Sequence, residues 1–227
     1  MGMDSPQQPQ RVLHPVLRQS LFVAGTDTGV GKTWFCVQLL RALVTAGCDA
    51  AGMKPVAAGA DSTSLGPRNE DALALMAAGN VPLPYELVNP VCLRRATSPH
   101  LAAREEGVVV DPGVILHAYS RICAKNRLIV VEGAGGWLAP VGEPLSAGNV
   151  GPTMQDIAMA LGLPVVLVVG IRLGAINHAL LSAEAIRRSG LRLAGWVANC
   201  PDQEFSDKGR YIESIALRLP EPLIWRS

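Results

Sequence analysis

Residues 25–33, GTDTGVGKT, combine residue types that can bind a phosphate group. Glycines let backbone N–H groups converge on an anion, and a helix that begins there adds the positive end of its dipole. Lys32 can reach the β- and γ-phosphates of a nucleotide, and the Thr33 hydroxyl can bind Mg²⁺. The common spacing of such loops requires a glycine where this chain has Thr26, and the glycine stands one residue earlier, at Gly25. The segment therefore predicts a variant phosphate-binding loop rather than a turn that merely needs glycine.

A second candidate is the carboxylate of Glu132, which ends an apolar run and precedes Gly133, Ala134 and Gly135. A carboxylate at the C-terminal end of a parallel strand faces the crevice in which α/β sheets bind ligands. Glu132 could bind Mg²⁺ or accept a proton there. By itself this pattern fits a plain strand-ending loop equally well, but beside a phosphate-binding loop it indicates an acid on the metal side of the site.

Two more charged residues could complete that site. Lys54 follows the apolar stretch 50–53 and precedes a proline, which favours an extended backbone. Its ammonium group could be a solvated surface charge, or it could hold a phosphoryl group or an anionic intermediate. Asp71 begins a predicted helix, where an acid can simply stabilise the helix dipole. Alternatively, Asp71 could be a third metal ligand beside Thr33 and Glu132.

Strands that alternate with helices must position these residues. Buried parallel strands are predicted over 21–24, 50–53, 127–131, 164–170 and 193–198. Helices are predicted over 34–46, 70–78, 111–125 and 177–189. This alternation predicts one α/β domain over 21–227 with a doubly wound, mainly parallel sheet. We expect residues 1–20 to be a flexible arm and the Gly- and Pro-rich segment 141–152 to be a surface loop.

Composition and charge limit the classes of protein to which the chain can belong. With 227 residues, of which 49% are apolar and 17% charged, the chain can bury a large core and a subunit interface. The net charge of +1 predicts no binding to nucleic acid or to an anionic membrane. The longest apolar stretch, 161–171, is too short to span a bilayer, and the N-terminus lacks a signal-peptide core. Five scattered cysteines and four dispersed histidines predict reduced thiols in the cytoplasm and no zinc site.

The chain resembles the dethiobiotin synthetase family, which belongs to the P-loop NTPase superfamily. The resembling segments follow the order of the family and cover most of residues 21–200. They are GTDTGVGKT (25–33), KPVAAG (54–59), NEDALAL (69–75), NPVCLRRATSPH (89–100), VEGAGGW (131–137), LPVVLVVGIRLGAINHALL (163–181) and LAGWVAN (193–199).

The resemblance implies an ATP-dependent cyclo-ligase of biotin biosynthesis. The family forms a carbamate from CO₂ on one amine of 7,8-diaminopelargonate. ATP phosphorylates this carbamate to a carbamic-phosphoric anhydride, and the second amine then closes the ureido ring of dethiobiotin, releasing ADP and phosphate. The implied cofactor is Mg²⁺, with ATP as co-substrate. The implied assembly is a homodimer whose substrate site lies near the interface.

The resemblance also implies a role for each matching residue. The expected catalytic residues are Lys54, Lys32 and Thr28, and the expected metal ligands are Thr33, Asp71 and Glu132. The expected nucleotide-binding residues are Gly29, Val30, Gly31, Lys32, Thr33, Trp34, Asp71, Glu132, Gly133, Ala134, Gly135, Asn199 and Cys200, with Asn199 reading the adenine edge. The expected substrate-binding residues are Lys54, Ala58, Ser98, Gly174, Ala175, Ile176 and Asn177, of which the last four receive the substrate carboxylate across the dimer interface.

The sequence departs from the family pattern at three places. Ala58 stands where the family often has a hydroxyl residue, so we expect the loss of one polar substrate contact worth about 1 kcal/mol. Cys200 replaces a frequent aspartate. The sequence given ends at Ser227, before a Gly-x-Ile-Pro loop that packs on the base in the family. Without that loop we expect weaker adenine recognition and broader nucleotide selectivity.

Three other functions fit parts of the pattern. An amidotransferase-like ligase, such as a cobyrinic acid diamide synthase, usually carries a glutaminase domain, for which 227 residues leave no room. A partitioning or cell-division ATPase carries an extra lysine near the start of the loop, where this chain has Thr26, Asp27 and Thr28. A paralogue that only binds nucleotide is compatible with the short C-terminus.

Overall fold

The computed structural model describes residues 13–124, 127–144, 150–202 and 204–227. Its centre is a six-stranded sheet in the order β10-β9-β8-β1-β7-β2, with all neighbouring strands parallel. The strands are β1 (Leu21–Gly25), β2 (Asp49–Met53), β7 (Arg127–Gly136), β8 (Val165–Gly170), β9 (Leu193–Asn199) and β10 (Leu223–Arg226). The chain adds strands on one side of β1 and then on the other, so the predicted doubly wound parallel sheet is confirmed.

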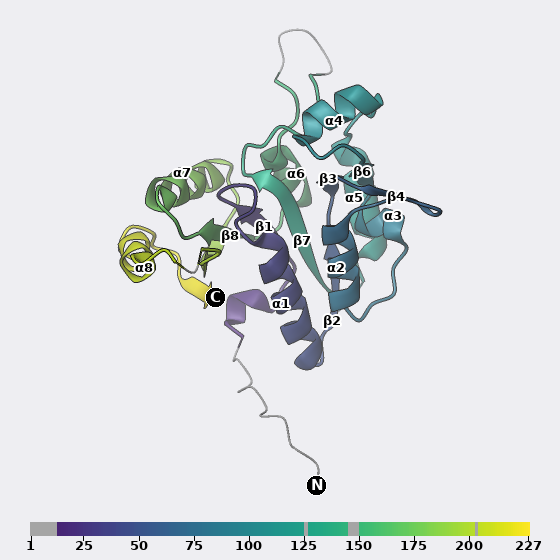
Figure 1. The fold of residues 1–227 in the computed structure, drawn as a ribbon. Helices are drawn as coiled ribbons and strands as arrows, with labels where there is room; N and C mark the ends of the chain where they lie inside the picture. The colour runs from purple at the N-terminus through teal and green to yellow at the C-terminus, as the bar shows by residue number, and fades with distance from the viewer. Residues whose placement is uncertain (1–12, 125–126, 145–149, 203) are drawn as a thin grey trace.

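Helices cover both faces of this sheet (Figure 1). One face carries α1 (Lys32–Thr45) and α2 (Glu70–Ala78), which lie side by side. The other face carries α5 (Pro112–Ile122), α6 (Met154–Leu161), α7 (Ala175–Arg188) and α8 (Lys208–Ala216). The strands must therefore be apolar on both sides, which explains why they are nearly continuous apolar runs in the sequence.

The sheet separates two hydrophobic cores, one on each face, and the residues of β1 alternate between them. Leu21 and Val23 pack in the core under α1, while Phe22 and Ala24 pack in the core on the opposite face. This alternation follows from the two-residue period of a strand. Every residue of β1 is buried, so the phosphate-binding loop that follows starts from a rigid support.

Several short elements surround the sheet. They are a 3-10 helix (Pro15–Leu17), the parallel pair β3 (Val56–Ala58) and β6 (Val91–Leu93), the hairpin β4 (Asp61–Thr63) and β5 (Gly66–Arg68), and the helices α3 (Tyr85–Val88) and α4 (Pro99–Glu106). None of these short elements was predicted from the sequence, and neither were α6, α8 and β10. Among the described residues no helix has both the length and the apolar character needed to cross a membrane.

Some boundaries differ from the predicted ones. β7 continues past residue 131 to Gly136, and α5 ends at Ile122 because Cys123 adopts an extended backbone. α1 and α7 each begin two residues earlier than predicted, immediately after the positive-φ glycines Gly31 and Gly174. The periodicity of side chains does not record these first turns, because a left-handed glycine begins each helix.

The expected arm and the expected loop lie only partly within the described residues. Residues 1–12 of the arm lie outside them, and residues 13–20 fold onto the domain, with Leu17 fully buried in the core under α1. Residues 145–149 of the loop also lie outside them. Val141, at the start of the expected surface loop, is fully buried in the hydrophobic core, and its N–H donates to the Pro152 carbonyl oxygen.

Candidate active site

A cavity of about 800 Å³ opens where β1, β2 and β7 end. This is the C-terminal edge of the parallel sheet, next to the point at which the strand order reverses, where doubly wound folds bind ligands. The cavity is lined by Asp27, Thr28, Gly29, Gly31, Lys32, Thr33, Lys54, Ala57, Ala58, Asn69, Asp71, Ala96, Thr97, Ser98, Pro99, Glu132, Ala134, Gly135, Gly136 and Ala139.

The phosphate-binding loop wraps around the ammonium group of Lys32. Lys32 Nζ donates a hydrogen bond to the Asp27 carbonyl oxygen at 2.8 Å. A Cβ at Gly25 would lie 2.9 Å from that nitrogen, so the displaced glycine of the variant loop permits this close approach. The loop ends at Gly31, whose φ of 90° begins α1. The N-terminus of α1 therefore points its free N–H groups toward the cavity.

Asn199 supports the same loop from the end of β9. Its Nδ2 donates to the Val30 carbonyl oxygen at 2.8 Å. A Cβ at Gly31 would lie only 2.0 Å from this nitrogen, so glycine is required here by space as well as by φ. The contact brings a residue from the far part of the chain against the phosphate-binding loop.

Four polar side chains meet at the floor of the cavity. Thr33 Oγ1 lies 2.7 Å from Asp71 Oδ1 and 2.8 Å from Glu132 Oε1. Lys54 Nζ donates to Asp71 Oδ2 at 2.8 Å and to Glu132 Oε1 at 2.5 Å. Lys54 and Glu132 are buried, whereas the Asp71 side chain is one-third exposed. The structure thus brings together the four residues that the sequence analysis selected from four separate segments.

Opposite charges set the protonation states in this cluster. Burial by itself would lower the pKa of Lys54, but Glu132 and Asp71 outweigh it and raise that pKa above its ordinary value. Burial would raise the pKa of Asp71, yet the charge and hydrogen bond of Lys54 bring it below its ordinary value. Burial, followed by the charge of Lys54, lowers the pKa of Lys32 to about 8. Lys54 therefore keeps its proton near neutral pH, and Lys32 is the cation that titrates first.

The cluster suits a hard divalent cation. Thr33, Asp71 and Glu132 offer hydroxyl and carboxylate oxygens, which are the ligands that Mg²⁺ prefers. Glu132 Oε2 is buried and accepts no hydrogen bond from the described residues. A buried carboxylate oxygen without a donor is costly unless a ligand satisfies it. These donors fit the expected metal.

The other predicted site residues fall into two groups. Thr28, Gly29, Ala58, Ser98, Ala134 and Gly135 line the cavity with the four clustered residues, Gly31 and Lys32. Val30, Trp34, Gly133, Asn199 and Cys200 do not line it, and neither do Gly174, Ala175, Ile176 and Asn177. Gly133 faces the core, where a Cβ would lie 3.1 Å from the Phe22 ring.

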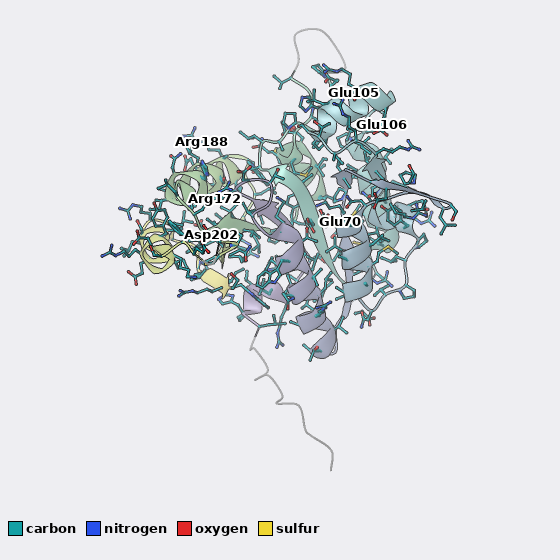
Figure 2. All side chains as sticks on the ribbon, viewed as in Figure 1. Glu70, Glu105, Glu106, Arg172, Arg188 and Asp202 are labelled. Atoms are coloured by element: carbon teal, nitrogen blue, oxygen red, sulfur yellow. The ribbon has the colours of Figure 1, made fainter. Side chains whose placement is uncertain are left out.

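The segment before α7 nevertheless contacts the phosphate-binding loop. Arg172, labelled in Figure 2, precedes this helix and pairs with Asp27, with Arg172 Nη2 2.5 Å from Asp27 Oδ2. Gly174 and Asn177 at the start of α7 are exposed. These two residues therefore lie at the protein surface.

Several residues that line the cavity were not predicted from the sequence. Asn69 is the most informative, because its side-chain oxygen accepts from the Ala72 N–H and caps the first turn of α2, which contains Asp71. Asn followed by Glu-Asp is a recognised helix-start signal and could have identified it. Thr97 and Ala96 lie in a loop with no such signal.

Comparison with known proteins identifies a family model and relatives that match most of this chain. A family model described as "AAA domain" matches residues 19–223. The chain is 48% identical over 208 residues to the ATP-dependent dethiobiotin synthetase BioD of Pseudomonas paraeruginosa, covering 91% of this chain and 88% of that protein. It is 44% identical to the BioD protein of Vibrio cholerae, covering 91% of this chain and 86% of that protein.

Two solved structures share the fold at low sequence identity. The septum site-determining protein MinD of Pyrococcus horikoshii, complexed with Mg-ADP, has a TM-score of 0.51 and 14% identity, covering 90% of this chain and 79% of that one. Cobyrinic acid a,c-diamide synthase of Mycobacterium smegmatis, with bound ADP and magnesium, has a TM-score of 0.51 and 14% identity, covering 90% and 83%. At this identity the likeness supports the fold alone.

Proposed function

This chain belongs to the dethiobiotin synthetase family within the AAA-domain group, and we propose that its cavity joins CO₂ to 7,8-diaminopelargonate and closes the ureido ring of dethiobiotin. The reaction consumes ATP and releases ADP and phosphate. The observation that carries this proposal is the Lys54 ammonium group, held by Asp71 and Glu132 beside the phosphate-binding loop. The alternatives, a partitioning-type ATPase or a paralogue that only binds nucleotide, are not favoured by relatives at 44–48% identity.

The phosphates of ATP bind at the loop 25–33 and the N-terminus of α1. Backbone N–H groups of Gly29 to Trp34 provide the donors, and Thr28 adds a hydroxyl at the cavity wall. Lys32 releases the Asp27 carbonyl oxygen and turns its ammonium group to the β- and γ-phosphates. Asn199, which already packs on the loop, reads the adenine edge, and the neighbouring Cys200 contacts the base beside it.

Mg²⁺, held by Thr33, Asp71 and Glu132, supplies charge neutralisation to the phosphates when it is bound. Lys54 then has a separate task. Because its pKa is raised, it cannot serve as a base at neutral pH. It donates hydrogen bonds to the carbamate oxygens and to the γ-phosphoryl group, where negative charge concentrates during transfer. In the low-dielectric floor of the cavity, such a donor stabilises the transition state strongly.

The diamine occupies the wall formed by Ala58 and by the turn before α4. Ser98 lies on this wall, with its Oγ 3.0 Å from His100 Nδ1, and offers a hydroxyl contact. Ala58 provides no such contact, so the substrate has one polar partner fewer than a hydroxyl residue would give it.

A second copy of the chain completes the substrate site. The segment Gly174, Ala175, Ile176 and Asn177 begins α7 outside the cavity of its own chain. An exposed helix N-terminus can hold a carboxylate, and the exposed Leu173 and Leu181 flank it as apolar interface residues. We place this homodimer in the cytoplasm, where ATP is available.

The direct test is phosphate release from ATP with Mg²⁺, bicarbonate and 7,8-diaminopelargonate, together with mass-spectrometric detection of dethiobiotin. We expect release that requires the diamine and matches the dethiobiotin formed. Phosphate release that is independent of the diamine would overturn the proposal. Sedimentation at micromolar concentration tests the homodimer separately.

A further inference from the structure

One tyrosine hydroxyl outside the cavity connects the segments that carry Lys54 and Asp71, two of the three charged residues at its floor. Tyr85 begins α3, is 8% exposed and does not line the cavity. Its hydroxyl accepts a hydrogen bond from the Asn69 backbone N–H at 2.8 Å and donates to Asn89 Oδ1 at 2.9 Å. Burial raises the pKa of Tyr85 to about 12, so the hydroxyl keeps the proton that it donates.

On one side, this hydroxyl fixes the start of α2. Asn69 is 4% exposed and uses its side chain twice, accepting from the Ala72 N–H at 3.3 Å and donating to the Gly59 carbonyl oxygen at 3.0 Å. Its own N–H is bound by Tyr85. Asp71 lies in the first turn that Asn69 caps, so the position of Asp71 depends on this cap.

On the other side, the hydroxyl fixes the backbone of Lys54. Asn89 is 2% exposed, and its Nδ2 donates to the Lys54 carbonyl oxygen at 2.7 Å and to the Val91 carbonyl oxygen at 3.0 Å. The Lys54 N–H donates to the Val88 carbonyl oxygen at 2.8 Å. Both backbone groups of Lys54 are therefore bound by residues 88 and 89.

We propose that Tyr85, through Asn69 and Asn89, is a positioning residue that sets the 2.8 Å contact between Lys54 and Asp71 for catalysis. The proposal rests on the function proposed above and adds a residue that touches neither nucleotide nor diamine. Lys54 follows the edge strand β2 and Asp71 belongs to α2, so no strand ladder fixes one against the other. The Tyr85 hydroxyl provides that link within a buried network, where each group has a partner.

The test is Tyr85→Phe, which removes the hydroxyl and keeps the ring. The ring also carries the Arg68 guanidinium carbon 4.1 Å from its centroid, and this contact survives. Without the hydroxyl, Asn69 N–H and Asn89 Oδ1 lose their shared partner, and Lys54 can shift against Asp71. Because small displacements of a catalytic group are costly, we expect kcat to fall about tenfold or more. The KM for ATP should stay within about twofold, because the phosphate-binding loop is untouched.

Tyr119→Phe is the matched control. Tyr119 is a partly buried tyrosine on α5 whose hydroxyl lies beside Cys123 and Ser20, and it does not line the cavity. Both variants lose a tyrosine hydroxyl, but only Tyr85→Phe should lower kcat. Rates are expressed per nucleotide-binding site, counted by titration, so that unfolded protein does not enter the comparison. An unchanged kcat in Tyr85→Phe, or an equal fall in both variants, would overturn the proposal.

Hydrogen exchange gives a readout that does not depend on turnover. We expect the Asn69 and Lys54 amides to exchange faster in Tyr85→Phe, whereas the amides of the phosphate-binding loop should be unchanged. Unchanged exchange at both amides would also overturn the proposal. If Tyr85→Phe does not fold, Asn89→Ala, which removes the donor to the Lys54 carbonyl oxygen, is assayed by the same criteria. If the wild-type chain itself does not turn over the diamine, the proposed function fails, and exchange still decides the role of Tyr85.

Discussion

Lys54 Nζ lies 2.5 Å from Glu132 Oε1, although 78 positions separate the two residues in the sequence. The contact arises because β2 pairs in parallel with β7, with Met53 opposite Val131. Lys54 directly follows β2 and Glu132 is the next residue along β7, which continues to Gly136, so both side chains reach the cavity from neighbouring strands. Asp71 and Thr33 then join them from the starts of α2 and α1. The position of Lys54 against Glu132 therefore follows from strand register.

Replacing Lys54 by methionine should separate catalysis from nucleotide binding. The change removes the group proposed above to donate to the transferring phosphoryl group, so we expect turnover to fall by about 10²–10³-fold or more. It also leaves Asp71 and Glu132 without their shared cation, which should lower the free energy of unfolding by about 3–5 kcal/mol in the absence of Mg²⁺. Phosphate release and denaturant unfolding measure the two effects.

In the same variant, added Mg²⁺ should restore more stability than it adds to the wild type, because it neutralises the two carboxylates. ATP binding should persist. Turnover within tenfold of wild type would contradict the role of Lys54.

Replacing Gly31 by alanine should disrupt the phosphate-binding loop. At φ 90° a side chain is strained, and the new Cβ would lie 2.0 Å from Asn199 Nδ2. We expect a loss of about 2 kcal/mol or more in unfolding free energy, together with weak nucleotide binding. Gly47→Ala is the control, because Gly47 has a similar φ of 79° and open space around it. It should cost about 1 kcal/mol and leave nucleotide affinity unchanged. Equal affinities in the two variants would argue against the Gly31–Asn199 contact.

Nucleotide binding should take up a proton near pH 8. The pKa of Lys32 is about 8 in the free protein, so about half of the molecules carry a neutral Lys32 at that pH. The negative charge of ATP favours the ammonium form, and binding should therefore draw up to about half a proton from the buffer. Calorimetric titration in buffers of different ionisation enthalpy measures the uptake.

The uptake should fall to about a tenth of a proton at about pH 7, where Lys32 is mostly charged already. In Lys32→Arg it should disappear, because a guanidinium stays protonated. Equal uptake at the two pH values would show that another group titrates.

The pair of Arg187 and Glu221 should make stability depend on pH. Arg187 donates from Nε to Glu221 Oε1 at 2.9 Å and from Nη2 to Oε2 at 2.6 Å, joining α7 to the turn before β10. Despite partial burial, the hydrogen bond and charge of Arg187 lower the pKa of Glu221. The stabilisation is thus complete above the pKa of the unfolded chain and is lost as pH falls through the lower, folded pKa.

We expect Glu221→Gln to reduce the unfolding free energy by about 1 kcal/mol near pH 7, a modest value because Arg187 is one-third exposed. Toward about pH 3 the difference from wild type should shrink, since the wild-type carboxylate becomes protonated. Urea unfolding of the wild type and the variant at both pH values measures this difference in free energy. A difference that grows as pH falls would contradict the pairing.

Much of the site could be predicted because strand ends and loop chemistry are local signals. Lys54 and Glu132 each follow an apolar run, and Thr33 ends a phosphate-binding loop. The Tyr85 network could not be predicted in this way. Helix α3 has only four residues, so it shows no periodicity, and a buried tyrosine or asparagine resembles any other polar residue in a sequence. Gly174 to Asn177 were expected to contact the substrate across a dimer interface; they lie outside the cavity of their own chain, and that expectation stays a prediction.

The sequence by itself determined the alternation of strands and helices, the phosphate-binding loop and the residue types available for chemistry. Hydrophobic period, helix starts and glycine positions depend on neighbours a few residues apart. Only the tertiary structure decided that β7 lies between β1 and β2, and that Tyr85 joins Asn69 to Asn89. Strand order and buried hydrogen bonds arise from contacts between segments that are distant in the sequence. Such contacts form only when helices pack on both faces of the sheet. These contacts hold Lys54 in one position beside the phosphate-binding loop.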